Sequence, residues 1–592
     1  MVYRKMSKQS FPKTCGIKIS SKSKVVLEER YLRKNEKGEI VETLEEMFRR
    51  IARNIASADA KYNNTINTAR IENRFYDAMS NLEFLPNSPT LMNAGREFQQ
   101  LAACFVLPVE DSIESIFDAV KHAALIHQSG GGTGFSFSNI RHRNDLVSTS
   151  GGRASGPISF MKVFNEATEA INQGGFRRGA NMAILRVDHP DILDFISAKD
   201  REGNLINFNI SVSITDEFMK ALEKNRKYSL VNPRTGMVVR QLYAREVFDK
   251  LTYAAWKNGE PGVLFIDKIN DSNPTPDIGE IESTNPCGEQ PLLPFESCVL
   301  GSINLTKILV MDDGNYKINW QKLSDTIKLG VHFLDNVIDM NRFPLIDITR
   351  VTTRNRKIGL GVMGFADMLI KMGIPYNSTD ALNIADKLME FFSKEADTAS
   401  AELAEERGVF PNFEKSKLNK PGSLKLRNAT RTTIAPTGTL SIIANCSSGI
   451  EPLFALSYVH HILDNKEISG LHHLFEEISK EKGFYSQTLV KDISMKGTIR
   501  DIKNIPEDVK RVFVTAREIS PEWHVRMQAT FQKHVDNAVS KTVNFPQNST
   551  KEDVERVFLI AYKNGCKGIT VYRDKSRMSQ ALSIECACDE IL

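Results

Sequence analysis

The chain has 592 residues, 41% hydrophobic and 25% charged, which is typical of globular proteins and long enough for one large domain with additions or for several domains. Its 77 basic and 73 acidic residues leave a formal charge of +4, which argues against nucleic-acid binding, and no apolar run is long enough to cross a membrane. The basic N-terminus lacks the apolar core of a secretory signal, so we expect a cytoplasmic protein.

The predicted elements alternate between helices and short strands. Residues 1–40 are charged and rich in turns, after which Thr43 can cap a helix and Glu46 can bond back to it. This helix has an apolar stripe of Leu44, Met47, Phe48, Ile51, Ala52 and Ile55. In chain order there follow apolar runs of strand length over 183–187, 209–214, 262–266 and 299–305, a long helix over 380–407 that Gly408 ends, and a run over 432–435. This alternation predicts an α/β fold with a largely parallel sheet, and the residues from 573 on predict a mobile tail.

Eight cysteines are too few for a disulfide framework in a chain of this length. In a reducing compartment they are core thiols, metal ligands, or catalytic and redox groups. We find no clustered Cys and His residues of the kind that form a structural zinc site, so we expect no protein-bound metal ion. We interpret Cys15 and Cys446 as structural.

One segment combines a thiol with an amide and a carboxylate. Residues 283–294 read Ser-Thr-Asn-Pro-Cys-Gly-Glu-Gln-Pro-Leu-Leu-Pro, and Pro286 and Gly288 disfavour a helix. Alternate side chains of an extended segment share a face, so we expect Asn285, Cys287 and Glu289 to project together. A thiol can transfer a hydrogen atom, a carboxylate can act as a base, and an amide can hold a hydroxyl group. The alternative is a buried loop cysteine beside a capping Asn and a surface Glu.

A second segment, residues 436–441 with the sequence Pro-Thr-Gly-Thr-Leu-Ser, directly follows the last predicted strand. Its hydroxyl and backbone N–H groups can bind phosphate, most effectively where a helix begins immediately afterwards. The alternative is an ordinary hydroxyl-rich turn.

The chain as a whole resembles the ribonucleotide reductases. The resemblance covers roughly residues 25 to 575 and starts from Asn-Pro-Cys-Gly-Glu at 285–289, followed by Cys298. It extends, in the family's order, to Asn-Ser-Pro-Thr-Leu-Met-Asn-Ala-Gly at 87–95, Leu-Ala-Ala-Cys-Phe-Val-Leu at 101–107, Gly-Gly-Gly-Thr-Gly at 130–134, Gln-Gly-Gly-Phe-Arg-Arg-Gly at 173–179, Arg-Lys-Ile-Gly-Leu-Gly-Val-Met-Gly at 356–364 and the turn at 436–441.

The resemblance implies a role for each reactive residue. Cys287 would be the thiyl radical that removes the ribose 3′ hydrogen, Glu289 the base for the 3′-hydroxyl proton, and Asn285 a hydrogen-bonding partner of the ribose. Cys104 and Cys298 would supply two electrons and close to a disulfide; Cys104 alone would pass for a residue of a core strand. Cys586 and Cys588 in the tail would pass electrons on from thioredoxin or glutaredoxin, with half of a zinc site as the alternative.

The resemblance also implies two nucleotide sites. The substrate, a ribonucleoside diphosphate or triphosphate, would bind at Ser88, Ala103, Gly131, Gly132, Pro436, Thr437, Gly438, Thr439, Leu440 and Ser441; many relatives have serine where this chain has Ala103. Deoxynucleotide effectors would bind at Asp111, Ser112, Ile113 and Arg141, and their identity would be read by Gln173, Arg177 and Arg178. As isolated residues, these would be a surface turn and solvated charges.

The radical source follows from which class the chain resembles. Ribonucleotide reductases that depend on a separate metalloprotein have two adjacent tyrosines in the C-terminal part of the barrel, and no Tyr-Tyr pair occurs in this chain. The matching region, 565–573, has the single Tyr572 and resembles the cobalamin-dependent class, and the ending typical of the glycyl-radical class is missing. The resemblance therefore implies adenosylcobalamin as the cofactor.

The implied fold is a ten-stranded α/β barrel made of two parallel five-stranded halves with a central finger loop. We expect a mostly helical region over 1–85, the barrel over 86–575 and a flexible redox tail over 576–592. A homodimer is implied because the family's effector site lies beside a subunit interface. The competing hypotheses are the large subunit of a two-protein reductase and a nucleotide-binding homologue that has lost catalysis; the intact reactive residues argue against the second.

Overall fold

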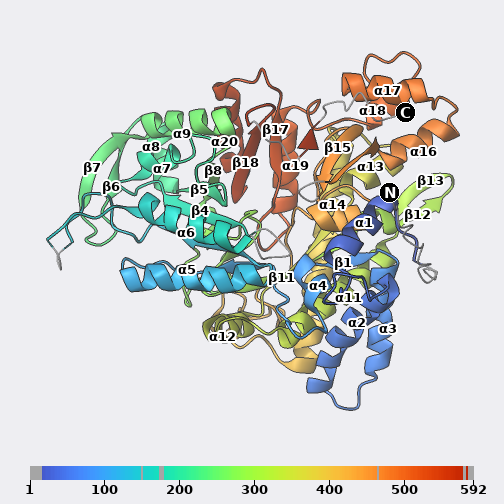
Figure 1. The fold of residues 1–592 in the computed structure, drawn as a ribbon, viewed down its shortest axis with the longest axis horizontal. Helices are drawn as coiled ribbons and strands as arrows, with labels where there is room; N and C mark the ends of the chain where they lie inside the picture. The colour runs from blue at the N-terminus through green and yellow to red at the C-terminus, as the bar shows by residue number, and fades with distance from the viewer. Residues whose placement is uncertain (1–16, 148–150, 173–178, 463–465, 578–581, 584–592) are drawn as a thin grey trace, which may run out of the picture.

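The N-terminal helices pack beside the barrel (Figure 1). The structure is a computed structural model that describes residues 17–147, 151–172, 179–462, 466–577 and 582–583. Helix α2 (Leu44–Ala56) begins at the predicted capping box, in which Thr43 N donates to Glu46 Oε2 at 2.7 Å and Glu46 N donates to Thr43 Oγ1 at 3.2 Å. All six residues of the predicted apolar stripe are buried, so this prediction is confirmed. The stripe packs towards the long barrel helix α11 (Trp320–Met340).

The first half of the barrel consists of parallel strands that follow one another along the chain. They are β2 (Cys104–Val106), β3 (Gly132–Ser136), β4 (Asn181–Arg186), β5 (Phe208–Ile214) and β8 (Gly262–Phe265). Each pairs with the next through a parallel ladder. The intervening helices are α5 (Ile113–Gln128), α6 (Pro157–Asn172), α7 (Ile192–Ile196), α8 (Asp216–Glu223) and α9 (Ala244–Asn258).

The second half is less regular. Its named strands are β11 (Ser297–Asn304), β14 (Ile358–Met363), β17 (Thr542–Phe545) and β18 (Gly568–Arg573). The predicted strand at 432–435 makes only isolated parallel bridges, Leu360 to Thr432 and Ile434 to Val539. The ladder is interrupted here because Ala538 N donates to Glu289 O of the central hairpin instead of to a neighbouring strand. The helices around this half include α14 (Thr379–Arg407), α19 (Pro521–Gln532) and α20 (Lys551–Lys563), and α14 confirms the predicted helix over 380–407.

Antiparallel pairs close the ring. At one seam β2 pairs with β11, and at the other β8 pairs with β18. The segment 430–434 bridges β14 to the chain that leads into β17, so each half contributes five strands, and β1 (Phe84–Pro86) pairs with β11 from outside the ring. The ten-stranded α/β barrel with two parallel halves is therefore confirmed.

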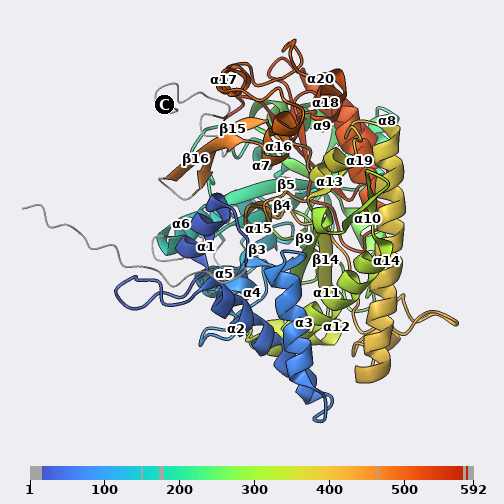
Figure 2. The same cartoon turned by 90° about the vertical axis from the view of Figure 1, so that its right-hand side faces the viewer.

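The remaining elements lie around this framework (Figures 1 and 2), except for the short hairpin over residues 283–292, which lies against strands β2, β3 and β4 inside the barrel. The helices are α1 (Ser21–Arg30), α3 (Thr68–Ser80), α4 (Ser88–Asn93), α10 (Ile266–Asp271), α12 (Ile346–Asn355), α13 (Phe365–Lys371), α15 (Gly438–Ala444), α16 (His473–Glu481), α17 (Gln487–Lys496) and α18 (Glu507–Val512). Short 3-10 turns cover Ser57–Lys61, Leu305–Lys307 and Phe413–Lys415. The hairpins are β6 (Lys227–Val231) with β7 (Val238–Tyr243), β9 (Ser283–Thr284) with β10 (Pro291–Leu292), β12 (Leu309–Asp312) with β13 (Asn315–Ile318), and β15 (Ser457–Ile462) with β16 (Lys466–Leu471).

Part of the predicted C-terminal tail pairs with this outer layer. Strand β19 (Leu582–Ser583) adds antiparallel to β15, so the chain returns to the β15–β16 hairpin before the last residues. Across the described ranges, we find no helix with the length and apolarity needed to cross a bilayer.

Candidate active site

The predicted reactive segment forms a hairpin inside the barrel. Strands β9 and β10 pair antiparallel, and β9 lies against β2, β3 and β4. A turn closes the hairpin: Gly288, with φ +81°, donates its N–H to Asn285 O at 3.0 Å. The Asn285 side chain stabilises this turn, because its Oδ1 accepts from Gln290 N at 3.0 Å. The turn presents Cys287 at the tip, where its side chain is exposed.

The turn corrects the expectation that three side chains share one face. Asn285 and Glu289 are only 3% and 2% exposed, whereas Cys287 is exposed. The alternation of an extended strand does not hold here because the chain reverses direction at residues 285–288. The amide and the carboxylate therefore flank the thiol from the buried side of the tip.

Both halves of the barrel hold the hairpin. On the first half, Asn209 Nδ2 donates to Pro286 O at 2.8 Å. On the second half, Glu289 O accepts from Ala538 N at 3.0 Å and from Thr433 Oγ1 at 3.0 Å. The backbone on either side of Cys287 is thus fixed from opposite directions.

Two further thiols lie at the seam beside the hairpin. Cys104 of β2 and Cys298 of β11 are direct partners in the antiparallel register, and both are buried. Directly opposed residues have Cα atoms about 4.5–5.5 Å apart, which is within the range a disulfide requires. Asn285 Nδ2 lies 3.2 Å from Cys104 Sγ, so the hairpin contacts this pair directly.

The surroundings of Cys298 favour its protonated form. Complete burial raises the pKa of the Cys298 thiol well above its usual value; Lys357 opposes this shift, while Glu296 and Glu289 add to it. Lys357 is itself paired with Glu296, with Nζ and Oε2 2.6 Å apart in the barrel interior. A thiol kept protonated at neutral pH can deliver both a proton and an electron.

The predicted phosphate turn begins beside the two thiols. Ala435 belongs to the same small apolar cluster as Cys104 and Cys298. Thr437 then takes a left-handed conformation, with φ +50°, and helix α15 starts at Gly438, where an added Cβ would meet no atom within 4 Å. Gly449 N donates to Thr437 Oγ1 at 2.7 Å, which fixes the turn.

Other residues predicted to bind substrate adjoin this region. Ala103 is half-buried in the cluster around the thiols, and a Cβ on Gly132 would lie 3.0 Å from the Pro286 ring. Gly131 packs tightly under Phe105, where a Cβ would lie 2.6 Å from the ring. Ser88, the first residue of α4, bonds to Tyr31 with 2.8 Å between the hydroxyl oxygens.

The predicted effector residues that the structure describes also come together, at the start of α5. Arg141 Nε lies 2.8 Å from Asp111 Oδ2, and Arg141 N donates to Asp111 Oδ1 at 3.1 Å. Ser112 caps α5 by accepting from Ser115 N at 3.1 Å, and Ile113 is 63% exposed. Six residues with a predicted role lie outside the described residues: Cys15, Gln173, Arg177, Arg178, Cys586 and Cys588.

Comparisons with known proteins identify the family. A family model described as "Ribonucleotide reductase, barrel domain" matches residues 102–572, and one described as "Ribonucleotide reductase, all-alpha domain" matches residues 18–99. The chain belongs to the ribonucleotide reductase family.

The reductase relatives include close ones. A protein of Thermoplasma acidophilum named "Vitamin B12-dependent ribonucleoside-diphosphate reductase" is 49% identical, over 96% of this chain and 80% of its own length. A protein of Mycobacterium tuberculosis with the same name is 46% identical, over 96% of this chain and 81% of its own. The solved structure of the Actinobacillus ureae class Id ribonucleotide reductase alpha subunit has a TM-score of 0.77 at 23% identity and covers 94% of this chain and 97% of its own, a likeness of fold.

The fold of this ribonucleotide reductase also brings together residues that sequence reasoning missed. Asp367, His472 and His473 place one ligand atom each within 4.8 Å of one another, although the sequence analysis found no clustered metal ligands. The adjacent histidines were the only local signal, because the carboxylate lies more than a hundred residues away in the sequence. The buried pair of Lys357 and Glu296 was missed for the same reason.

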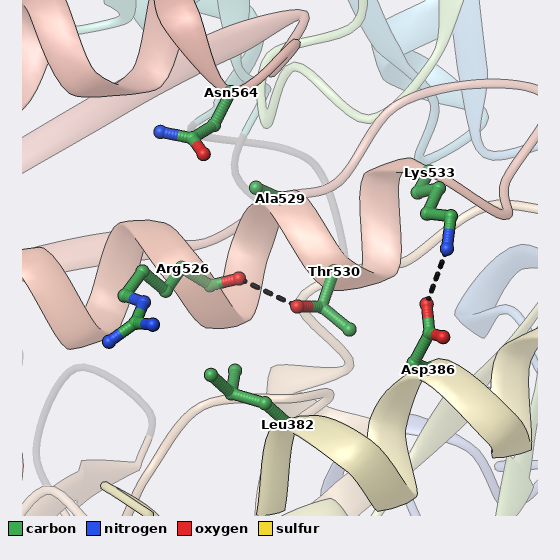
Figure 3. Close-up of a pocket in the computed structure, with 7 residues that line it drawn as sticks. All are labelled: Leu382, Asp386, Arg526, Ala529, Thr530, Lys533 and Asn564. Carbon is green, nitrogen blue, oxygen red and sulfur yellow. Dashed lines mark hydrogen bonds and ion pairs between the residues drawn. The ribbon is translucent and has the colours of Figure 1, made fainter. Parts of the chain in front are cut away.

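A surface hollow of about 410 Å³ lies elsewhere, between α14 and α19 (Figure 3). Polar side chains that line it already have partners: Asp386 pairs with Lys533 at 2.9 Å, and Thr530 Oγ1 donates to the backbone carbonyl of Arg526 at 2.9 Å. None of the predicted site residues lines this hollow, so we assign no catalytic role to it.

Proposed function

We propose that the chain is an adenosylcobalamin-dependent reductase that converts ribonucleoside diphosphates into 2′-deoxyribonucleotides by a thiyl-radical mechanism. The observation that carries the proposal is the placement of Cys287 at an exposed hairpin tip, with Asn285 linking it to one of two opposed, buried thiols. The diphosphate form of the substrate is proposed from the names of the Thermoplasma and Mycobacterium relatives.

The hairpin tip fits a large cofactor. Cys287 is exposed although its neighbours are buried, and a Cβ on Gly288 would meet no atom within 4 Å. Cys287 and Gly288 would therefore face the cofactor. When bound there, adenosylcobalamin supplies the one-electron oxidation of the Cys287 thiol through homolysis of its cobalt–carbon bond.

The residues of the chain then carry the reaction. The Cys287 sulfur takes the 3′ hydrogen atom of the ribose, and the Glu289 carboxylate takes the 3′-hydroxyl proton. The 2′-hydroxyl leaves as water, and Cys104 and Cys298 supply two electrons and two protons as they close to a disulfide. Cys287 finally returns the hydrogen atom to C3′. Asn285 holds the ribose while it contacts Cys104.

Substrate phosphate would bind at the turn over 436–441 and at Ser88. The open space beside Gly438 supports this, and so does the start of α15, which no side chain among the described residues caps. Ala435 also places the turn next to the two thiols. This arrangement would set the ribose between the turn and the hairpin tip.

The first experiment measures deoxynucleotide formed from each ribonucleotide with dithiothreitol, with and without adenosylcobalamin. We expect product only with the cofactor, none from Cys287→Ser, and no multiple turnover from Cys104→Ser or Cys298→Ser. Cys566→Ala is the matched control, because Cys566 is a buried thiol outside the site and should leave turnover intact. Product that requires a second metalloprotein would instead show a two-protein reductase and overturn the cofactor assignment.

The electron supply is proposed to run through Cys586 and Cys588. Strand β19 brings the chain back to the β15–β16 hairpin only a few residues before them. The double variant Cys586→Ser/Cys588→Ser should keep turnover with dithiothreitol and lose turnover driven by thioredoxin or glutaredoxin. Equal turnover with both kinds of reductant would refute the shuttle.

Deoxynucleotide effectors are proposed to bind where Asp111 and Arg141 meet. The pair is about one-fifth exposed, so an effector can reach it and use Asp111 for a deoxyribose hydroxyl and Arg141 for phosphate. Gln173, Arg177 and Arg178 would read the effector's identity. Asp111→Ala should remove the dependence of substrate choice on added deoxynucleotide, measured with pairs of competing substrates.

Helix α5, which begins beside the effector residues, supports a homodimer. Ile113, Phe117 and Leu125 lie along one side of α5 and are 63%, 51% and 37% exposed, which is an unusual apolar stripe for a solvent-facing helix. A second copy of the chain would cover it and adjoin the effector residues. Phe117→Glu should give monomers in sedimentation experiments, and Tyr253→Glu, at another exposed aromatic residue, should not.

A further inference from the structure

A second cluster of potential ligands lies at the end of the barrel, on the outer layer. Asp367 belongs to α13, which directly follows β14, whereas His472 and His473 stand at the start of α16 (Figure 2). One carboxylate oxygen and one nitrogen from each imidazole lie within 4.8 Å of one another.

Hydrogen bonding within the described residues leaves part of this cluster unsatisfied. Asp367 is fully buried; its Oδ2 accepts from Ser447 N at 2.9 Å, whereas its Oδ1 makes no well-aligned hydrogen bond to the described residues and faces His472 Nε2, 3.2 Å away. His472 is 8% exposed, and its buried Nδ1 also has no hydrogen-bond partner. Burying a carboxylate oxygen that accepts no well-aligned hydrogen bond is costly, so Asp367 Oδ1 can bind a ligand together with the nearby His472 Nε2.

The spacing fits a metal ion. Asp367 Oδ1 and His472 Nε2 are 3.2 Å apart. Two ligand atoms at about 2.0–2.2 Å from a tetrahedral zinc ion lie about 3.3–3.5 Å from each other, so this pair needs almost no movement to share an ion. We propose that Asp367, His472 and His473 bind one divalent transition-metal ion of the zinc type, through one carboxylate oxygen and two imidazole nitrogens.

The donor set selects the kind of ion. Imidazole suits zinc and cobalt, whereas magnesium and calcium prefer oxygen ligands.

The ion would tie the outer layer to the loop after α15. Asp367 and Ser447 exchange two hydrogen bonds, and the next residues of that loop, Ser448 and Gly449, bond to Ser441 and Thr437. The metal would thus connect α16 and the β15–β16 hairpin to the turn over 436–441. Its role is structural and does not depend on the proposed reaction.

The experiment measures metal bound by the full chain in the absence of cobalamin. Protein carrying Cys586→Ser/Cys588→Ser, so that the tail thiols cannot bind zinc, is stripped with a chelator, incubated with Zn²⁺ and analysed by mass spectrometry for metal per chain. We expect one zinc ion per chain, none in His473→Ala, and none with Mg²⁺ or Ca²⁺. His534→Ala is the matched control: His534 pairs with Asp386 at 2.7 Å without a third ligand and should keep the zinc.

Two further measurements separate metal loss from misfolding. Co²⁺ should give the intense visible bands of a tetrahedral site, and these should disappear in His473→Ala and in Asp367→Asn. Zn²⁺ should raise the thermal unfolding temperature of the parent protein and leave that of His473→Ala unchanged. The proposal is wrong if the parent binds no more zinc than His473→Ala, or if zinc stabilises both proteins equally.

Discussion

The two halves of the barrel hold the central hairpin in different ways. The first half is a set of continuous ladders against which the hairpin backbone lies so closely that a Cβ on Gly134 would stand 1.7 Å from Thr284 O. The second half has only isolated bridges next to the hairpin, and there the contacts are hydrogen bonds to Glu289 O from Thr433 and Ala538. Both sides make hydrogen bonds to the hairpin, but only the first half also places backbone against backbone, whereas close contacts on the second half involve side chains that can move. This difference predicts effects of different size for changes on the two sides.

The largest effect is expected from Gly134→Ala. The new methyl group would overlap a backbone carbonyl, which cannot turn away as a side chain can, so the hairpin must leave its position. We expect a loss of about 4 kcal/mol or more in the free energy of unfolding, measured with urea, and no detectable turnover.

Two other glycines, with less severe steric overlap, serve as comparisons for that loss of stability. Gly359 is the counterpart in the second half, where a Cβ would meet the ends of the Gln290, Leu300 and Thr433 side chains at 2.7 Å. These can shift, so Gly359→Ala should destabilise less than Gly134→Ala. A Cβ on Gly279 would lie 3.6 Å from Leu293, an ordinary contact, and Gly279→Ala should change little. Equal losses for all three would contradict the steric account.

In the second half, Asp536 replaces part of the missing ladder. Its Oδ2 accepts from Arg431 N at 2.7 Å and Thr432 N at 3.2 Å, and its Oδ1 lies 3.1 Å from the Arg431 guanidinium. Asp536→Ala would leave two backbone N–H groups without this acceptor, and we expect a loss of about 2 kcal/mol in the free energy of unfolding. Asp386→Ala removes an exposed carboxylate together with its pairs to Lys533 and His534, and because that carboxylate is solvent-screened the loss should be less than about 1 kcal/mol (Figure 3). If Asp536→Ala costs no more than that, the carboxylate is not what holds this segment.

The first half contains a buried titratable group of its own. Burial lowers the pKa of His127 to about 4, and its Nε2 lies 3.0 Å from Thr133 Oγ1 of β3. Between pH 6.5 and 4 the unfolded chain binds a proton at this site that the folded chain does not, so stability falls as pH falls through that window and is unaffected above it. We compare the free energy of unfolding of the wild type with that of His127→Gln. The wild type should lose about 1.4 kcal/mol relative to the variant for each unit by which the pH falls below about 6. A difference that stays constant with pH would show that His127 is protonated in the folded state.

The contrast between local and long-range contacts explains which features could be predicted from the sequence. Helices with a local signal, such as the capping box at Thr43 and the apolar stripe after it, form where their pattern places them. The register of Cys104 against Cys298 was accessible only through the family resemblance, because the two strands are far apart in the chain and no local pattern sets their pairing.

The errors lie where tertiary contacts replace local preferences. The segment over 432–435 bonds to both neighbouring segments but only through isolated bridges, because Thr432 N donates to Asp536 and Ala538 N donates to the hairpin. Asn285, Cys287 and Glu289 alternate in sequence but not in exposure, because Gly288 closes a turn. The cluster of Asp367 with His472 and His473 joins two helices through the fold alone, so no spacing rule could have found it.

The smallest effect is expected from Thr433→Val, which tests the polar side of the comparison directly. The Thr433 hydroxyl donates to Glu289 O at 3.0 Å, and that carbonyl keeps a second partner, Ala538 N, when the hydroxyl is removed. The loss should therefore be about 1 kcal/mol in the free energy of unfolding, and Thr433→Ser, which keeps the hydroxyl, should recover most of it. Because Glu289 would accept the substrate proton, turnover should fall further in the valine variant than in the serine variant. Identical turnover in the two variants would mean that the steric contacts of the first half are sufficient to place Glu289.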